Sequence, residues 1–497
     1  TLGISSASPA AVNPLQCVVG GVSSSTCAVT FSDSGFIFDV PNMLSGKPTS
    51  ASLQAVKKSD SSQKCVPGFA AGKRNVLFSR TYVSPGTGTE PVLVNGASVT
   101  NNTTVELNFD ASALAPLAVR YDDAGALNLS ASFTGSGLEA GLLMTGSDPF
   151  VARPVGYCVF SDSANSDCVS GDASCSKMMA AGDPFRLGIK AVAWETDGDT
   201  DFCTGNTKTR NYLQAGISLG SNLVAPAGGV AGTLAVASVD LVASDSGEKV
   251  LSNQTISEVG VFTLTATSPG TYLNGPPVGD SNGDGLLDQV SASVNIGRFY
   301  PASLDVSGSA SLAPSCANAD PLKSFSYQGQ PMSFANAQEP LLTVAGLNRS
   351  GGLTSNYDRG NFWKLVPPGR EAYRSVTGKS TLDAPGRLLT GGVASLTQSG
   401  ADNGDGARSY RWTGEVLTYS PALLPLTDDL PFTAAIRQGF TAASLTDADG
   451  ACYLQGHSSC QSFSFDFTSL AGSLVTPGSE VRLGRLRIDN ANGSELQ

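Results

Sequence analysis

Apolar and polar residues alternate with a period of two along many short stretches of this chain, and the period of an α-helix is nearly absent. Alternation places successive side chains on opposite faces of a strand, so each stretch has one apolar face to bury. One-sided strands bury that face against a second sheet, so we predict an all-β protein built of tandem immunoglobulin-like β-sandwich modules with disulfide-closed loops. The clearest alternation falls at residues 105–109, 127–133, 262–266, 290–296 and 463–467.

The composition supports this fold class and excludes several others. The 497 residues include 56 Gly and 27 Pro, which break helices and suit turns between short strands. A hydrophobic content of 41% excludes a disordered chain, and no uncharged apolar run reaches the ~18 residues of a membrane span. The net charge of −12 argues against nucleic acid or an anionic membrane as the main partner.

An internal repeat sets the expected size of one module. Residues 123–131 and 258–266 both read as an acidic residue, a small residue, Gly and then an alternating strand, and Gly125 and Gly260 are 135 positions apart. An acidic residue and Gly before such a strand resemble the tight corner that precedes strand F in immunoglobulin-like modules. We therefore predict a disulfide-looped segment at 1–33 and sandwiches at 34–135, 136–299 and 300–497, the last with a candidate division near 383–386.

The ten cysteines indicate disulfide bonds in an oxidising compartment, since no Cys-x-x-Cys pair suggests zinc or a redox motif. The chain starts at Thr1 without an initiator Met, so we expect a processed or truncated product from which any export signal has already been removed. Short spacings predict the bonds Cys17–Cys27, Cys158–Cys168 and Cys452–Cys460. We also predict Cys175–Cys203, because this pair falls within one module, and we leave the partners of Cys65 and Cys316 open.

One acidic loop has the spacing of a calcium site. Acidic or amide side chains at positions 1, 3 and 5, a turn Gly at position 6 and a closing Asp at position 9 supply the oxygen ligands that Ca²⁺ needs. Because the loop lies between two predicted strands just before residue 298, we expect bound calcium to stiffen the link between the second and third modules. The alternative is a metal-free turn. The predicted ligands are Asp280, Asn282, Asp284, the Leu286 carbonyl and Asp288.

A second acidic run repeats part of this spacing. Asp197, Asp199 and Asp201 fit positions 1, 3 and 5, but Phe202 stands where the turn Gly should be. We treat it as a candidate second metal loop, with a solvated loop as the plainer interpretation. The runs 402–406 and 447–450 are interpreted as ordinary turns.

Catalytic motifs are scarce. The single histidine, His457, lies in a Gly/Ser-rich loop between two cysteines, where a solvated residue is the expected role. No G-x-S-x-G elbow, Walker loop or H-E-x-x-H motif is present. Trp194, Trp363 and Trp412 suit either core positions or a sugar-stacking platform. We therefore expect a non-enzyme, with a glycosidase-like enzyme using two carboxylates as the alternative.

Several short motifs occur in a fixed order along the chain. They are VNIGRFYP at 294–301, FSYQGQP at 325–331, LTSNY at 353–357 and RLGRLRIDNANGSE at 482–495, with FDVP at 38–41, CVP at 65–67 and YDDAG at 121–125 further upstream. Their order and spacing resemble MshQ-like proteins of the mannose-sensitive haemagglutinin (MSHA) type IV pilus system of Gram-negative bacteria.

The resemblance implies an extracellular structural or adhesive component associated with a pilus or the cell surface, in a domain without an assigned biochemical activity. Its expected partners are other pilus or surface proteins and host or environmental glycans. The alternative function is a secreted carbohydrate-binding module or a polysaccharide-active enzyme.

Overall fold

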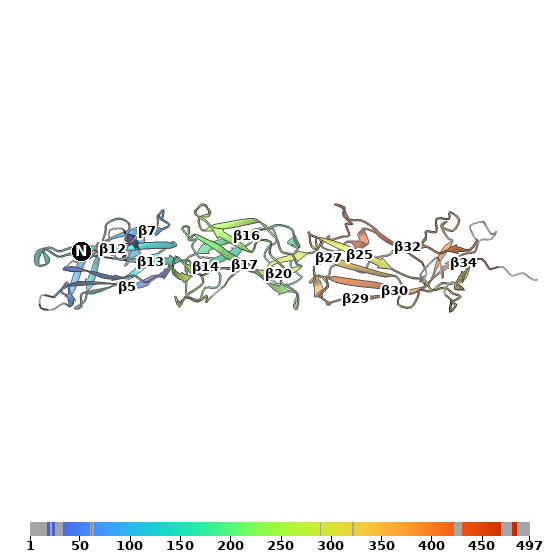
Figure 1. Cartoon of the computed structure of the whole chain (residues 1–497), viewed down its shortest axis with the longest axis horizontal. Helices are drawn as coiled ribbons and strands as arrows, with labels where there is room; N and C mark the ends of the chain where they lie inside the picture. Colours follow the sequence, from blue (N-terminus) through green and yellow to red (C-terminus); the bar gives the residue numbers. More distant parts are fainter. Residues whose placement is uncertain are drawn as a thin grey trace, which may run out of the picture.

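The computed structural model is a row of three β-domains arranged end to end (Figure 1). It describes residues 17–19, 22–24, 33–59, 61, 64–288, 290–320, 323–421, 430–468 and 480–484. Strands form all regular structure of the described residues apart from short 3-10 helices, and none of those helices is long and apolar enough to cross a membrane. The predicted all-β class of immunoglobulin-like sandwiches is therefore confirmed. A small hairpin of β1 (Cys17–Val19) and β2 (Val22–Ser24) precedes the first domain.

The first domain packs two sheets around one apolar core. One sheet has the order β10-β7-β12-β13-β4 and the other β3-β5-β11-β8-β9, with β6 beside β5. The strand bounds are β3 (Ser34–Asp39), β4 (Met43–Leu44), β5 (Thr49–Lys58), β6 (Cys65–Pro67), β7 (Gly72–Ser84), β8 (Val92–Val94), β9 (Ala97–Val99), β10 (Thr103–Phe109), β11 (Leu114–Tyr121), β12 (Gly125–Thr134) and β13 (Leu143–Arg153).

The second domain packs the sheet β14-β16-β19 on the sheet β15-β24-β20-β17-β18, in which β23 also pairs with β20. The bounds are β14 (Gly156–Phe160), β15 (Met179–Ala180), β16 (Phe185–Val192), β17 (Gln214–Ala225), β18 (Ser238–Leu241), β19 (Glu248–Gln254), β20 (Gly260–Thr267), β23 (Ser291–Ala292) and β24 (Ile296–Tyr300), with the hairpin β21 (Thr271–Tyr272) and β22 (Gly275–Pro277).

The third domain packs the sheet β25-β27-β30-β29 on the sheet β28-β32-β33, and a short sheet β26-β34-β31 lies at its far end (Figure 1). The bounds are β25 (Ser303–Ser309), β26 (Ser326–Tyr327), β27 (Leu341–Leu347), β28 (Arg374–Ser375), β29 (Leu388–Ser399), β30 (Ala407–Tyr419), β31 (Phe432–Thr433), β32 (Ile436–Phe440), β33 (Phe463–Phe467) and β34 (Glu480–Arg482).

Two predicted module boundaries differ from the structure. The break predicted at 135/136 would cut off β13, yet β13 pairs with β12 over ten residue positions, from Leu143 to Ala152, so the first domain extends to Arg153. The division considered near 383–386 would separate β25 and β27 from β29 and β30, which share one sheet. In both cases long-range strand pairing overrides a turn-rich stretch of sequence.

The predicted alternation matches burial in four of the five stretches and is inverted over residues 290–294 of the fifth, while Ile296 is buried as predicted. Val290 and Val294 are exposed, whereas Ser291 and Ser293 between them are buried. The serine hydroxyls accept hydrogen bonds from the backbone N–H groups of Tyr157 (2.8 Å) and Leu264 (2.9 Å). Buried backbone donors need partners, so the serine side chains face the core, where the valine side chains were predicted to lie.

The disulfides differ in part from the predicted pairs. Cys452–Cys460 is present as predicted, but Cys158 is bonded to Cys203, and Cys168 is bonded to Cys175. The predicted bonds Cys158–Cys168 and Cys175–Cys203 are therefore wrong. Of the remaining cysteines, Cys65 and Cys316 are free, and the predicted Cys17–Cys27 bond involves Cys27, which lies outside the described residues.

Packing explains the exchange of partners. β14 begins at Gly156, and a Cβ atom there would lie only 2.3 Å from the ring of Phe202. Glycine thus lets this ring pack directly on β14, which brings the adjacent Cys203 to within 4.7 Å (Cα–Cα) of Cys158. That distance is normal for a disulfide.

Candidate functional site: the junctions between the domains

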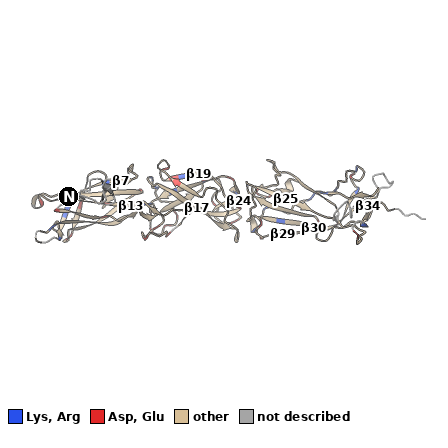
Figure 2. Cartoon of the chain, viewed as in Figure 1, with Lys and Arg blue, Asp and Glu red and all other residues tan. Residues whose placement is uncertain are grey.

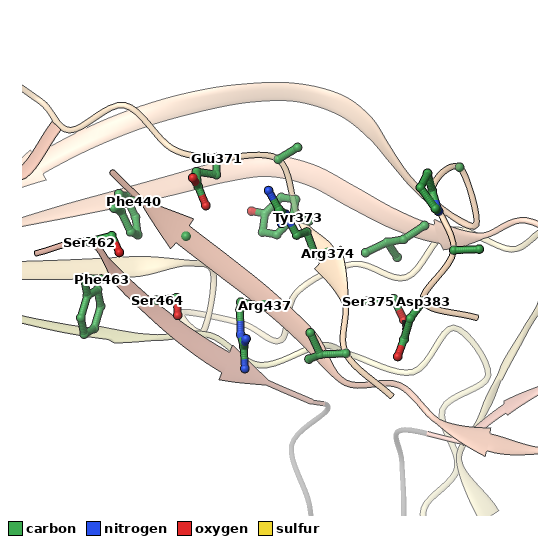
Figure 3. Close-up of a pocket in the computed structure, with 17 residues that line it drawn as sticks. Glu371, Tyr373, Arg374, Ser375, Asp383, Arg437, Phe440, Ser462, Phe463 and Ser464 are labelled. Atoms are coloured by element: carbon green, nitrogen blue, oxygen red, sulfur yellow. Dashed lines mark hydrogen bonds between the residues drawn. The ribbon is translucent and has the colours of Figure 1, made fainter. Parts of the chain in front are cut away.

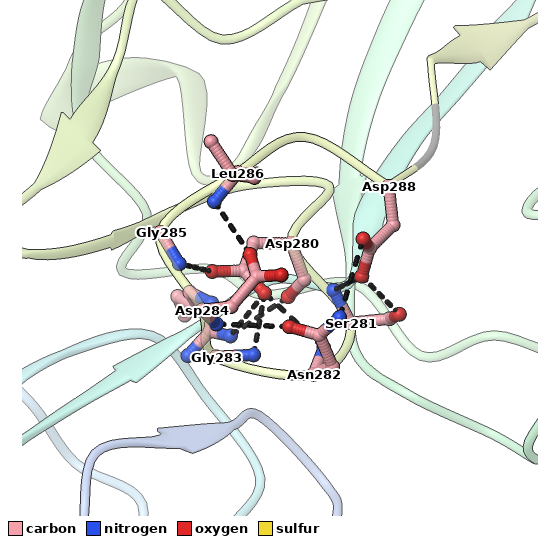
Figure 4. Close-up of polar contacts among 9 residues, drawn as sticks. Asp280, Ser281, Asn282, Gly283, Asp284, Gly285, Leu286 and Asp288 are labelled. Carbon is pink, nitrogen blue, oxygen red and sulfur yellow. Dashed lines mark hydrogen bonds and ion pairs between the residues drawn. The ribbon is translucent and has the colours of Figure 1, made fainter.

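Asp280 organises the predicted calcium loop from within (Figure 4). Its side chain is fully buried, and its Oδ1 accepts hydrogen bonds from the backbone N–H groups of Asn282 (3.1 Å) and Gly283 (2.5 Å). Its Oδ2 accepts one from the N–H of Gly285 (2.8 Å). One carboxylate therefore holds the whole turn in place.

The other two predicted carboxylate ligands are directed differently. Asp284 Oδ1 accepts the N–H of Leu286 (2.8 Å), whereas Asp288 Oδ2 accepts the N–H (2.9 Å) and hydroxyl (2.6 Å) of Ser281. The hydroxyl bond is the main reason that the pKa of Asp288 is lowered. Among the described residues, no three His, Cys, Asp or Glu side chains are grouped so that they could hold a metal ion. In this conformation Asp280, Asn282 and Asp284 line the loop, and Asp288 lies to one side beside Ser281 (Figure 4).

The acidic loop lies at the junction of the first and second domains, which we call the first junction. Arg153, the last residue of β13, donates from Nη2 to the backbone oxygen of Asp280 (2.7 Å) and lies 3.7 Å from its Oδ1. The expected position between the second and third domains is therefore wrong. The loop lies between β22 and β23 in the connection from β20 to β24. Because β20 and β24 are antiparallel, the loop lies at the end of the domain opposite the third domain.

The second acidic run also lies at the first junction. Asp197 Oδ1 accepts hydrogen bonds from Lys47 Nζ (2.6 Å) in the first domain and from Trp194 Nε1 (3.0 Å). Phe202, at the position of the missing turn Gly, is buried beside Cys158. The run thus provides a charge contact between domains and an anchor for the disulfide.

A buried carboxylate connects the first and second domains. Asp123, in the first copy of the internal repeat, is 3% exposed, and its Oδ1 accepts the N–H groups of Ala124 (2.7 Å) and of Asn211 (2.9 Å) in the second domain. Burial raises the pKa of this carboxyl group. An unpaired N–H in a dry interface would be costly, so the carboxylate fixes the position of the segment around Asn211.

The second copy of the repeat does the same at the second junction, between the second and third domains. Glu258 is 4% exposed, and its carboxylate accepts the N–H groups of Val259 (2.9 Å), Ser355 (2.9 Å) and Asn356 (3.1 Å). Asn356 then donates from Nδ2 to the Val259 carbonyl (2.8 Å). Burial raises the pKa of Glu258, as it does for Asp123.

A pair of glycines marks equivalent positions on the two junctions. Gly46 has a φ of +83°, and a Cβ added to it would lie 2.9 Å from the Trp194 carbonyl oxygen of the next domain. Gly182 has a φ of +84°, and a Cβ added to it would lie 3.0 Å from the Arg349 backbone nitrogen of the next domain. The residue before each glycine accepts a backbone N–H across the junction, at 2.8 Å in both cases. The two junctions therefore share the same backbone contacts.

The second junction also contains a buried ion pair. Arg298 Nη1 and Nη2 donate to the two carboxylate oxygens of Asp449 (2.5 and 2.7 Å), and its Nε donates to the Cys175 carbonyl (2.8 Å). Arg298 and Asp449 are each 6% exposed. Asp449 belongs to the run 447–450, which the sequence indicated only as a turn, and its partner lies 151 positions away.

Apolar contacts are continuous across both junctions. Ala124 and Val151 of the first domain belong to the core of the second, and Val259 and Val261 of the second belong to a cluster with Leu304 and other residues of the third. Continuous cores leave little room for one domain to swing relative to the next.

The remaining candidate residues give no catalytic arrangement. His457 is exposed on its loop, as predicted, and Trp363 and Trp412 are core residues at 9% and 6% exposure. A groove of about 570 Å³ on the third domain carries Glu371, Asp383 and several serines, without a tryptophan in its lining (Figure 3). Neither the sugar platform nor the pairing of two carboxylates beside an exposed tryptophan is formed there.

These features define the class of protein: serial immunoglobulin-like β-sandwiches joined by buried polar and apolar contacts. More particularly, the chain belongs to the DUF6701 family, described as a domain of unknown function. The first Ig-like domain of the family matches residues 14–147, the second domain 153–253 and the third domain 258–466. The sheets of the structure differ at one point, because they place β20 and β24 in the second domain.

Solved structures match the chain at low sequence identity and low TM-score. Invasin, a bacterial integrin-binding protein, is 12% identical with a TM-score of 0.28, covering 83% of this chain and 57% of the invasin chain. Titin domains I67–I69 are 7% identical (TM-score 0.30; 92% and 100% covered), and the Yersinia pseudotuberculosis adhesin InvE is 13% identical (0.26; 55% and 60%). No functionally curated protein matches the chain significantly.

Proposed function

We propose that this chain is a non-catalytic, rigid spacer on the outer surface of a Gram-negative bacterium, which holds an adhesive partner away from the cell. The observation that carries this proposal is the repeated junction. Asp123 and Glu258 occupy equivalent positions, and each accepts backbone N–H groups from the next domain. A chain of independent binding modules would not need a buried carboxylate at every joint.

The disulfides support an oxidising, extracytoplasmic location, since such bonds are rare in reducing compartments. The MshQ-like motifs support the finer assignment to an MSHA-like type IV pilus, with other pilus or surface proteins and glycans as partners. Antibody labelling of intact cells should detect the protein along with the pili. Labelling only after permeabilisation, or normal adhesion after deletion of the gene, would contradict this assignment.

Small-angle X-ray scattering of the full chain tests the rigidity. Strands of thirteen residues are ~43 Å long, so three domains in line should have a maximal dimension of roughly 130 Å. We expect one narrow distribution of conformers, which agrees with a straight rod. A scattering profile that can be fitted only with a broad distribution including bent conformers would refute the rigid spacer.

We also propose that Ca²⁺ binds the acidic loop, through Asp280, Asn282, Asp284 and the Leu286 carbonyl. Asp288 would have to leave Ser281 to complete the ligand set. Because Arg153 contacts Asp280, calcium would stiffen the first junction. Calorimetric titration with Ca²⁺ should give one binding event that is lost in Asp284→Ala and kept in Asp405→Ala, an exposed aspartate of the similar run at 402–406. The absence of binding heat in the wild type would leave a metal-free turn.

A further inference from the structure

The third domain carries an unprotected sheet edge. β29 is the last strand of the sheet β25-β27-β30-β29, and among the described residues it pairs only with β30. Ten of its twelve residues are exposed. An exposed edge offers a row of backbone N–H and C=O groups to which another strand can pair.

The other long edges of the molecule are protected by charge or burial. Natural edge strands carry charged residues that prevent the addition of another strand. Edge strands β3, β10, β19, β25 and β33 each include at least one acidic residue, and β14 is almost completely buried. Charged residues are thinly spread over the ribbon (Figure 2), and β29, with the sequence LLTGGVASLTQS, has none.

Three apolar side chains on β29 are largely open to water. Leu396 lies opposite the buried Trp412 of β30 and so points to the core face of the sheet, yet it is 41% exposed. Leu389 is 48% exposed, and Val393 is 85% exposed. An added strand would extend the sheet and shield these side chains from water.

We propose that β29 is a self-association edge, on which a second copy of this chain pairs its own β29 in the antiparallel direction. A charged strand would find no counter-charge on this edge, so the added strand should be uncharged. β29 is the longest uncharged exposed strand in the described part of the chain and meets this requirement itself. The net charge of −12 on each copy also favours contact through an uncharged surface.

The register follows from symmetry. Antiparallel pairing about a twofold axis sets one residue opposite its own copy. Centring the axis on Val393, at the β-bulge that interrupts the pairing of β29 with β30 between Gly392 and Ser395, pairs residues 388–398 of the two copies. Residues 388–392 then lie opposite residues 394–398 of the other copy, and the two highly exposed Val393 side chains meet on one face of the sheet at the axis. Twofold symmetric contacts of this kind are the commonest in protein dimers.

Sedimentation equilibrium of the full chain tests the proposal. The wild type should show a monomer–dimer equilibrium, and Val393→Lys should weaken it about tenfold or more, since the axis brings two lysines together. Val169→Lys is the control, because Val169 is 95% exposed on a loop of the second domain. Circular dichroism should show that both variants remain folded.

Amide hydrogen exchange locates the interface. The β29 amides that do not bond to β30 should exchange more slowly as protein concentration rises. A wild type that stays monomeric at its highest soluble concentration would overturn the proposal. So would a dimer that Val393→Lys leaves intact, or β29 protection that occurs only with an added uncharged peptide. The spacer role does not depend on this result.

Discussion

Replacing Glu258 with alanine should uncouple the third domain from the second. The substitution removes the acceptor for the backbone N–H groups of Ser355 and Asn356, both from the third domain. Leaving a buried donor unpaired costs about 1–3 kcal/mol, so two donors cost about 2–6 kcal/mol. Relief of the buried charge, which is visible in the raised pKa of Glu258, offsets part of this cost. We expect a net loss of about 2–4 kcal/mol.

Differential scanning calorimetry of the full chain measures this loss. For cooperative units of 150–250 residues, 1 kcal/mol shifts the melting temperature by about 2–4 °C, so Glu258→Ala should lower the transition of the second and third domains by roughly 4–16 °C. Its scattering profile should also broaden, as the second junction bends.

Glu248→Ala is the matched control, because Glu248 forms only a half-exposed ion pair with Lys208 in the same domain. Such pairs contribute about 0–1 kcal/mol, so this variant should melt within a few degrees of the wild type. If the two variants melted alike, or if Glu258→Ala remained a straight rod, the buried carboxylate would not be the element that fixes the junction.

Three further outcomes are expected. Addition of a chelator to the calcium-loaded chain should lower its melting temperature, whereas the same addition should not affect Asp280→Ala. Peptide mapping without reduction should recover Cys158 linked to Cys203, and Cys158→Ser should destabilise the second domain by about 2–5 kcal/mol in denaturant titrations, as loss of a native disulfide does. Because burial raises the pKa of Glu258 and Asp123, the folded chain binds these protons more tightly than the unfolded chain, and their contribution to stability is lost as pH rises through the folded pKa values. The melting temperature of the wild type relative to Glu258→Gln should therefore rise as pH is lowered from neutrality through the raised pKa of Glu258, and an unchanged difference would contradict the raised pKa.

The fold class could be predicted because it depends on local pattern. Alternation, turn residues and the scarcity of helical periodicity all favour the same all-β answer. The pattern failed at 290–294, where Ser291 and Ser293 satisfy buried backbone donors and the valines face water. Period-two alternation defines two faces and does not say which is buried when hydroxyl groups can serve as core acceptors.

Pairings between distant residues could not be predicted. Cys158 is nearer in sequence to Cys168 than to Cys203, yet the ring of Phe202 decides the pairing by packing on Gly156. The repeat identified Asp123 and Glu258, but their function needs backbone groups of the following domain, 88 to 98 positions later. Sequence spacing identified the candidate residues, but their partners can be seen only in the folded junctions.

The two junctions share one kind of contact between domains and differ in a second kind. Both use a buried acid to bind the next domain's backbone, which fixes the relative position of the domains. At the second junction, the Arg298–Asp449 pair adds a contact within the protein that needs no ion. At the first junction, Arg153 instead binds the carbonyl of Asp280 in a loop with the spacing of a calcium site. Under the calcium proposal, stiffness at the second junction depends on the protein alone, while stiffness at the first responds to the calcium in the surrounding medium.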